Sequence, residues 1–228
     1  MGETHLPLAF WLLGALGVAA AGVYGSYFLA RPPTLLRTLV KTAFMAAIAA
    51  ALSTAQIPTP LVLAAAFSAL GDFFLGFDKK WILPFGILAF LLAQLLYVVI
   101  FVALWFFSGD NAPLWPRYAA MALIIATTLA FLIWMAPKLG WFALGVVPYA
   151  LAITAMAAAA MWLPWAGWPA MIGALSFLVS DLVLSAELFR LPADAPARRI
   201  TAPVVWWTYA AAQVLIVAGV LLAARHAV

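Results

Sequence analysis

Cysteine is missing from this 228-residue sequence, and histidine occurs only twice, as His5 and His226. Without cysteine there is no disulfide scaffold, no thiolate chemistry and no cysteine-ligated zinc or iron–sulfur site. Two histidines at opposite ends of the sequence argue against a Ser-His-Asp arrangement, a haem-binding pair and a histidine-rich zinc site. There is also no glycine-rich loop of the kind that cradles phosphates. We therefore expect neither a metal site nor a cofactor.

Charge is scarce as well: only 8% of the residues are charged, whereas 69% are hydrophobic. Soluble domains carry about 25% charged residues, so a water-exposed surface built from this composition would be far too apolar. The composition excludes a soluble enzyme, a disordered tail and a nucleic-acid binder with a basic face. It predicts an all-α, polytopic membrane protein.

Long apolar runs fill most of the sequence. A helix needs about 20 mostly apolar residues to cross a membrane. Segments rich in proline, glycine or charge separate the runs, and no such segment is long enough to form a soluble domain. We predict a single transmembrane domain over residues 1–228, with eight spans at roughly 8–29, 35–55, 60–77, 82–107, 117–135, 141–162, 168–190 and 202–224.

The basic residues are distributed unevenly over the predicted loops. Nine lie on the side of the loop between the first two spans, and only Arg117 and Arg225 lie on the other. Because lysine and arginine favour the cytoplasmic side, both termini are predicted to lie outside the cytoplasm. The net charge of +4 is then mainly a topology signal. Tryptophans near the span ends match an interfacial aromatic belt: Trp81, Trp115, Trp134, Trp141, Trp165, Trp168, Trp206 and Trp207.

Three ionisable residues lie inside predicted spans: Lys41, Asp72 and Asp181. Such groups are costly in a bilayer, so they usually face the interior of the helix bundle and mark functional sites. Lys41 has an alternative interpretation, because a lysine near a span end can extend its ammonium group to the interface. Glu187 lies one turn from Arg190 near the predicted cytoplasmic boundary, and we interpret these two residues as an interfacial pair.

Uncharged polar residues accompany these three at helical spacing. Gln94 and Tyr97 are three residues apart, and Tyr209 and Gln213 are four apart, so each pair shares one helix face. A rise of 1.5 Å per residue places Asp72 roughly 6–9 Å, and Asp181 roughly 10–17 Å, from the cytoplasmic ends of their spans. We predict that residues from five spans meet in one cavity. Taken singly, each glutamine or tyrosine is equally explained as a hydrogen bond between helices that only stabilises the bundle.

A short internal similarity relates the third and seventh spans. Residues 68–76 and 177–185 both contain a small residue, an aspartate and a leucine at the same spacing. The two spans lie four apart and are therefore parallel, as a duplicated four-helix unit, a parallel 4+4 repeat, would require. The similarity predicts that Asp72 and Asp181 approach one another. Two carboxyl groups in different surroundings can act as an acid and a base, and equally as a proton relay in a transporter.

Five stretches in the same order carry a resemblance to a known family. They are Val40–Thr42, Phe67–Leu75, Phe90–Phe101, Gly173–Leu184 and Thr208–Ile216. In order, spacing and span assignment they resemble the YhhN family of eight-span membrane proteins, whose characterised members are lysoplasmalogenases. Two positions depart from the family pattern. Gln94 replaces a usual histidine, which removes a titratable group, and Thr42 replaces a proline.

The resemblance implies an ether-bond hydrolase of the bacterial inner membrane that cleaves the vinyl-ether bond of a lysoplasmalogen. Asp72 and Asp181 are then the expected catalytic acid and base, with their order open. Lys41 is expected to meet the lipid phosphate. Residues expected to position the headgroup or the water are Gln94, Tyr97, Tyr209 and Gln213. The alternative is a transporter or lipid-handling protein that uses the same aspartates as a proton or cation relay.

Overall fold

The computed structural model describes residues 6–55, 57–108, 114–192 and 194–226, and within these ranges all regular structure is helical. The predicted all-α class is thereby confirmed. The break predicted at 109–113 and His5 lie outside the described residues. The α-helices are α1 (Leu8–Val23), α2 (Leu35–Thr54), α3 (Thr59–Leu75), α4 (Leu83–Ser108), α5 (Leu114–Leu139), α6 (Ala143–Ala160), α7 (Trp168–Phe189) and α8 (Arg198–His226).

Each predicted span coincides with a helical segment, the first with α1 together with the π-helical turn that follows it (Tyr24–Phe28), and the ends differ by at most four residues. Differences of four residues occur at the start of α8 and at the end of α5, which continues through Pro137 to Leu139. The chain turns instead at Gly140, whose φ of +51° favours glycine, and a 3₁₀ turn (Gly140–Phe142) leads into α6. Proline in the last turn of α5 therefore did not end that helix.

Six segments of the described residues are long and apolar enough to cross a membrane. One of them, Leu114–Ala160, contains both α5 and α6, and α3 is apolar but has only 17 residues. Large apolar side chains such as Leu144, Phe106 and Ile133 are more than 70% exposed. A helical protein with this outer surface is an integral membrane protein. The number of eight crossings, the single domain and the 4+4 repeat stay predictions.

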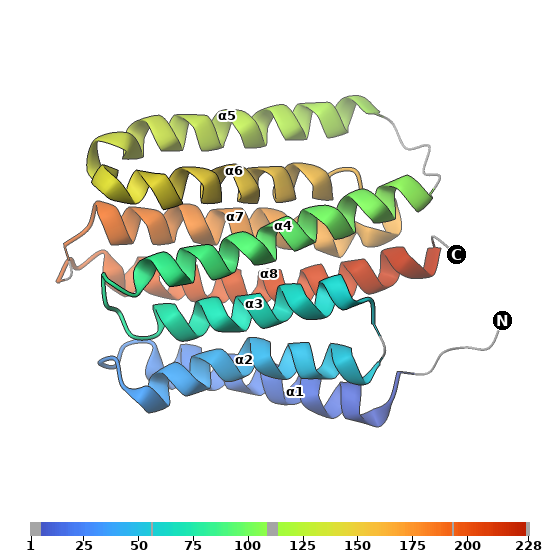
Figure 1. Cartoon of the computed structure of the whole chain (residues 1–228), viewed down its shortest axis with the longest axis horizontal. Coiled ribbons are helices and arrows are strands. Elements are labelled where there is room, and N and C mark those ends of the chain that lie inside the picture. Colours follow the sequence, from blue (N-terminus) through green and yellow to red (C-terminus); the bar gives the residue numbers. More distant parts are fainter. Residues whose placement is uncertain (1–5, 56, 109–113, 193, 227–228) are drawn as a thin grey trace. The chain divides into compact units, whose positions relative to one another are not determined.

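The chain forms two compact units, Met1–Leu96 and Tyr97–Val228, and each is described by itself. In the first unit α1 packs on α2 and α2 packs on α3 (Figure 1). Thr34 caps α2 by accepting a hydrogen bond from the backbone N–H of Arg37. The Arg37 guanidinium also bridges to Asp78 at 2.9 Å, which joins the start of α2 to the turn after α3.

In the second unit α5, α6, α7 and α8 follow one another as packed neighbours (Figure 1). The closest packing joins α7 and α8, where small residues let the backbones approach. A Cβ atom on Gly219 would lie 2.2 Å from the backbone nitrogen of Ala170, and one on Gly173 would lie 2.8 Å from the Ala212 carbonyl oxygen. This crossing fixes which faces of α7 and α8 are buried.

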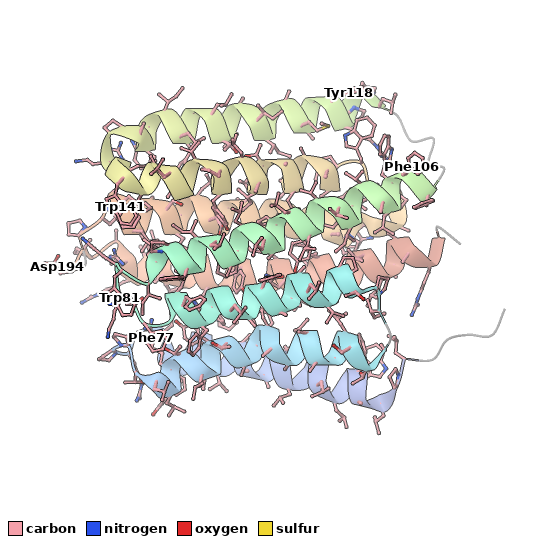
Figure 2. All side chains as sticks on the ribbon, viewed as in Figure 1. Phe77, Trp81, Phe106, Tyr118, Trp141 and Asp194 are labelled. Carbon is pink, nitrogen blue, oxygen red and sulfur yellow. The ribbon has the colours of Figure 1, made fainter. Side chains whose placement is uncertain are left out.

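The ends of the helices carry exposed aromatic side chains. In the second unit Trp141 and Asp194 lie at one end, and Phe106 and Tyr118 lie at the other (Figure 2). Most of the tryptophans predicted to form an interfacial belt are exposed, but Trp206 is only 3% exposed and packs against Tyr209. Trp206 is therefore part of the core of this unit and not of the belt. Because α8 begins at Arg198, four residues before the predicted span, Trp206 lies farther from the helix end than predicted.

Candidate functional site

Lys41 and Asp72 form an ion pair between α2 and α3 of the first unit, with 3.5 Å between Lys41 Nζ and Asp72 Oδ1. The Asp72 side chain is 1% exposed and that of Lys41 is 15% exposed. Close contact of the two helices explains the pair. A Cβ atom on Gly76 would lie 2.7 Å from Thr38 Cγ2, and Lys41 and Asp72 are each about one turn away from that contact point. The structure thus brings two of the predicted site residues together.

Ser68 shares the buried face of Asp72 on α3, as their spacing of four residues predicts. Its hydroxyl donates a hydrogen bond to the Ala64 carbonyl at 2.9 Å. That bond lies within α3, whereas Asp72 on the same face pairs with Lys41 of α2.

Gln94 on α4 is fully buried, and neither its side-chain oxygen nor its side-chain nitrogen has a hydrogen-bond partner among the described residues. Phe90, one turn earlier on the same face of α4, packs on Gly71 of α3: a Cβ atom there would lie 2.4 Å from the phenyl ring. The face of α4 that bears Gln94 therefore packs against α3. The prediction that Gln94 faces the interior is confirmed by its burial.

Asp181 on α7 is 9% exposed and accepts a hydrogen bond from the phenolic hydroxyl of Tyr149 on α6. Two serines next to it attach α7 to α8. Ser180 donates to the Val205 carbonyl at 2.9 Å, and Ser176 donates to the Thr208 carbonyl at 3.1 Å. Asp181 is thus held on a helix whose position is fixed from both neighbours.

Tyr149 was missed by the sequence analysis. It has no polar residue three or four positions away on α6, so it does not form a polar stripe of the kind used to find the other residues. The available signal was weaker: Tyr149 lies well inside its span, whereas aromatic residues of the interfacial belt lie near span ends.

The second unit also joins Tyr97 of α4 to Gln213 of α8. The Tyr97 hydroxyl donates to Gln213 Oε1 at 2.7 Å, and both side chains are fully buried. Tyr209, one turn before Gln213, packs edge-on against Phe177 with 5.4 Å between ring centroids. The predicted shared face of Tyr209 and Gln213 is buried, as expected.

One predicted pair is wrong. Glu187 accepts a hydrogen bond from Thr201 and lies 4.0 Å from the Arg198 guanidinium. Arg190 instead donates to the Trp134 carbonyl and lies over the Trp134 ring. The spacing of three residues between Glu187 and Arg190 did not determine the ion pair, because Arg198 at the start of α8 lies beside Glu187.

The predicted site residues fall in both units. Lys41, Asp72 and Gln94 belong to the first unit, and the remaining four belong to the second: Tyr97, Asp181, Tyr209 and Gln213. Their meeting in one cavity, and that of the two aspartates in particular, stays a prediction. No three His, Asp or Glu side chains of the described ranges are grouped so that they could hold a metal ion.

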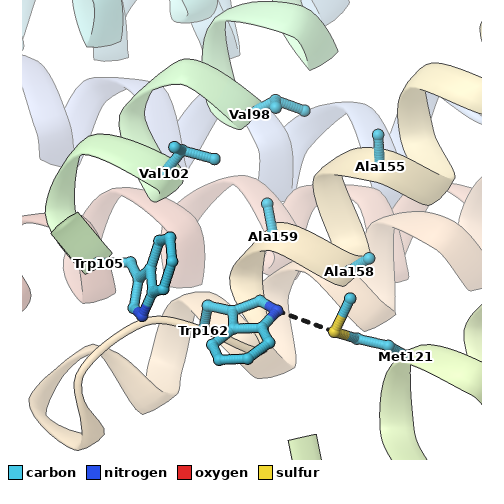
Figure 3. A pocket seen from close by; sticks show the side chains of 8 residues that line it. All are labelled: Val98, Val102, Trp105, Met121, Ala155, Ala158, Ala159 and Trp162. Atoms are coloured by element: carbon cyan, nitrogen blue, oxygen red, sulfur yellow. Dashed lines mark hydrogen bonds between the residues drawn. The ribbon is translucent and has the colours of Figure 1, made fainter. Parts of the chain in front are cut away.

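An apolar pocket of about 340 Å³ lies in the second unit between α4, α5 and α6 (Figure 3). The Trp162 indole N–H donates to Met121 Sδ at 2.8 Å at its edge, and the Trp105 ring lies 5.2 Å from that of Trp162. Arg117 donates to the Trp162 carbonyl at 2.8 Å. The pocket contains none of the predicted site residues; its lining consists of Val98, Val102, Trp105, Met121, Ala155, Ala158, Ala159 and Trp162.

Comparison with known proteins identifies relatives of this chain. The YhhN family matches residues 35–220, a range that includes every predicted site residue. A protein of Mycobacterium bovis named lysoplasmalogenase is 33% identical over 225 residues, which cover 92% of this chain and 82% of the relative. A protein of Mycobacterium tuberculosis with the same name is similar to the same extent. No solved structure matches the chain.

Proposed function

The chain belongs to the YhhN family, and on that premise we propose that it is a membrane-embedded hydrolase that cleaves the vinyl-ether bond of lysoplasmalogens. The products are a fatty aldehyde and a glycerophospho-ethanolamine or -choline. The observation that carries the proposal is the buried Lys41–Asp72 pair, a carboxylate held with its countercharge inside the membrane-spanning part of the chain. The name shared by the two mycobacterial relatives supports the substrate class.

The proposed reaction needs an acid, a base and a water molecule. An acid protonates the outer carbon of the enol ether, which converts the ether into an oxocarbenium ion. Water adds to the carbon that bears the ether oxygen and loses a proton to the base. The hemiacetal hydroxyl then gives its proton to the ionised acid, the protonated base donates its proton to the glycerol oxygen, and the carbon–oxygen bond to glycerol breaks, giving the aldehyde and the free glycerol hydroxyl. One water is consumed, and the proton taken from the acid is returned.

The contacts of the two aspartates favour one order of roles. Asp72 faces the ammonium group of Lys41, which suits a carboxylate that stabilises the cationic intermediate and accepts the proton of water. Asp181 accepts from the neutral phenol of Tyr149, and no cation partners it among the described residues of its unit. We therefore assign Asp72 as the base and Asp181 as the acid.

The remaining residues bind the substrate in this proposal. Lys41 has three N–H donors, so it can hold Asp72 and also contact the lipid phosphate at the cytoplasmic boundary. Tyr97 and Gln213, which are hydrogen-bonded to each other, form with Tyr209 a buried polar face that positions the glycerol part of the lipid. The lipid chain enters from the bilayer, and the aldehyde leaves the same way.

We place the chain in a bacterial inner membrane with eight crossings and both termini outside the cytoplasm. In the first unit Arg37 and Asp78 join the start of α2 to the turn after α3, which are both on the side predicted to be cytoplasmic. In the second unit Arg190, after α7, reaches the last turns of α5 at Trp134. Within each unit, the loops assigned to the cytoplasm therefore lie at one end, which supports the alternating course of the helices; the orientation is proposed from the distribution of lysine and arginine.

The test is aldehyde release from lysoplasmalogen by the purified protein in detergent, with no ion gradient present. Asp72→Asn and Asp181→Asn should each lower the rate at least about 100-fold, as expected for loss of a general acid or base. The matched control is Asp78→Asn, which makes the same substitution at a half-exposed loop residue and should keep full activity. Wild-type protein that releases no aldehyde, but shows gradient-dependent flux across proteoliposomes, would establish the transporter alternative instead.

A further inference from the structure

Gln94 has a polar side chain whose hydrogen-bonding groups are unused within the described residues. The side chain is 0% exposed, and both Oε1 and Nε2 lack partners there. An amide buried in this way costs about 1–3 kcal/mol for each polar group left without a partner. The same volume filled by leucine would not carry that cost. A ligand that supplies a donor and an acceptor at this position would explain the glutamine.

The pairing of α3 and α4 locates Gln94 relative to Asp72. A Cβ atom on Gly86 would contact Leu75, and one on Gly71 would contact Phe90, which sets an antiparallel register. The same register places Gln94 level with Phe67 and Ser68, one turn beyond the Phe90 contact. At 1.5 Å per residue, Gln94 and Asp72 are then separated by about 7 Å along the helix axes.

Along the helix axes, the side chains of these two residues tilt in opposite directions, each toward the level of the other. In an α-helix each Cα–Cβ bond tilts toward the N-terminus. The Asp72 side chain therefore tilts toward the level of Ser68, and the Gln94 side chain tilts back toward the level of Phe90. Both tilts shorten the separation of the two side chains along the helix axes.

The depth of Gln94 in the membrane indicates which polar ligand could bind to its side chain. Gln94 follows the first residue of α4, Leu83, by 11 residues, which is about 16 Å along the helix. The hydrocarbon core of a bilayer is about 30 Å thick, so Gln94 lies near its middle, far from the interface where a lipid phosphate resides. A buried water makes about three hydrogen bonds, and an amide together with a carboxylate supplies them.

We propose that Gln94 and Asp72 bind the water that adds to the vinyl-ether carbon; this inference rests on the proposed function. Gln94 Oε1 accepts one hydrogen bond from the water and Asp72 accepts the other, so a lone pair of the water oxygen is directed at the oxocarbenium carbon. As the new carbon–oxygen bond forms, the proton on the Asp72 side passes to that carboxylate. Gln94 is then a residue that positions the nucleophile without being protonated.

The variant that tests the inference is Gln94→Leu, with Thr128→Val as its control. Thr128 on α5 is also buried with an unpartnered hydroxyl among the described residues, and it belongs to no part of the proposed site. For both variants, kcat and KM for lysoplasmalogen and the melting temperature in detergent are measured. We expect Gln94→Leu to melt no lower than wild type, because removing an unpartnered polar group is neutral or stabilising.

Gln94→Leu should lower kcat about 100-fold, the effect of a misplaced reactant, and leave KM within about threefold. Thr128→Val should keep wild-type kcat. Gln94→Leu with wild-type kcat overturns the inference, and so does a lowered melting temperature, which would reveal a structural partner. A raised KM at constant kcat would assign Gln94 to the lipid instead. Wild-type protein without activity refutes the proposed function and, with it, this inference. Active wild-type protein together with a Gln94→Leu variant of unchanged kcat refutes this inference alone, so the two failures are distinguishable.

Discussion

Removing the Lys41 ammonium group should destabilise the protein strongly, because it leaves the Asp72 carboxylate without its countercharge. Lys41→Met keeps the length and apolar character of the side-chain stem, so the change is close to a deletion of charge. Asp72 is 1% exposed, so bulk solvent does not stabilise its charge in place of the lost ammonium group. The perturbation thus tests the ion pair itself and does not depend on any assumption about catalysis.

The magnitude follows from the distance of 3.5 Å between Lys41 Nζ and Asp72 Oδ1. At an effective dielectric constant of about 20, Coulomb attraction at that distance is about 5 kcal/mol. Breaking a buried pair by removing one partner costs about 3–5 kcal/mol. Asp72 also has other interactions, so we expect the lower end, about 3 kcal/mol. For a chain of this size that corresponds to a fall in melting temperature of roughly 6–12 °C.

The assay is thermal unfolding in detergent of wild type, Lys41→Met, Asp72→Asn and the double variant. The double variant should be more stable than the sum of the two single effects predicts, by about 1–3 kcal/mol. Lys138→Met, which removes an exposed lysine from the last turn of α5, is the control and should melt like wild type. Additive effects of the two single variants would refute the ion pair.

Two further predictions concern the second unit. Tyr149→Phe removes the hydroxyl that donates a hydrogen bond to Asp181. Loss of a hydrogen bond to a charged or charge-developing group costs about 1.5–3 kcal/mol, so the rate of aldehyde release should fall about 10- to 100-fold with little change in melting temperature. Unchanged kinetics would show that Tyr149 does not belong to the site. Gly219→Ala should lower stability by about 1–3 kcal/mol or more through overpacking, since its Cβ would meet the backbone of Ala170 at 2.2 Å. The control is Gly14→Ala in α1 of the first unit, where nothing lies within 4 Å of the added atom; it should be neutral or stabilising by about 0.5–1 kcal/mol in the same melting assay.

Local patterns in the sequence predict much of the candidate site. Asp72, Gln94, Tyr97 and Gln213 were selected because polar residues at helical spacing within an apolar span must face protein, and all four are buried. The spacing rule works because it depends only on helix geometry and the cost of exposing polar groups to lipid.

Partners across helices were less predictable. The bond from Tyr149 to Asp181 and the pairing of Glu187 with Arg198 and Thr201 join different helices. Each depends on how far one helix is rotated and shifted relative to its neighbour. Spacing along the sequence carries no information about either quantity.

The sequence by itself determined that the chain is helical, that its helices lie in a membrane, and which faces of those helices are polar. These properties follow from the length and period of apolar runs, which are local. Only the tertiary structure decided that Lys41 reaches Asp72, that Tyr149 reaches Asp181 and that Gln94 is left with unused hydrogen-bonding groups. The first of these outcomes depends on the close contact of α2 and α3 at Gly76 and the third on that of α3 and α4 at Gly71, where the absence of a side chain sets the register between neighbouring helices.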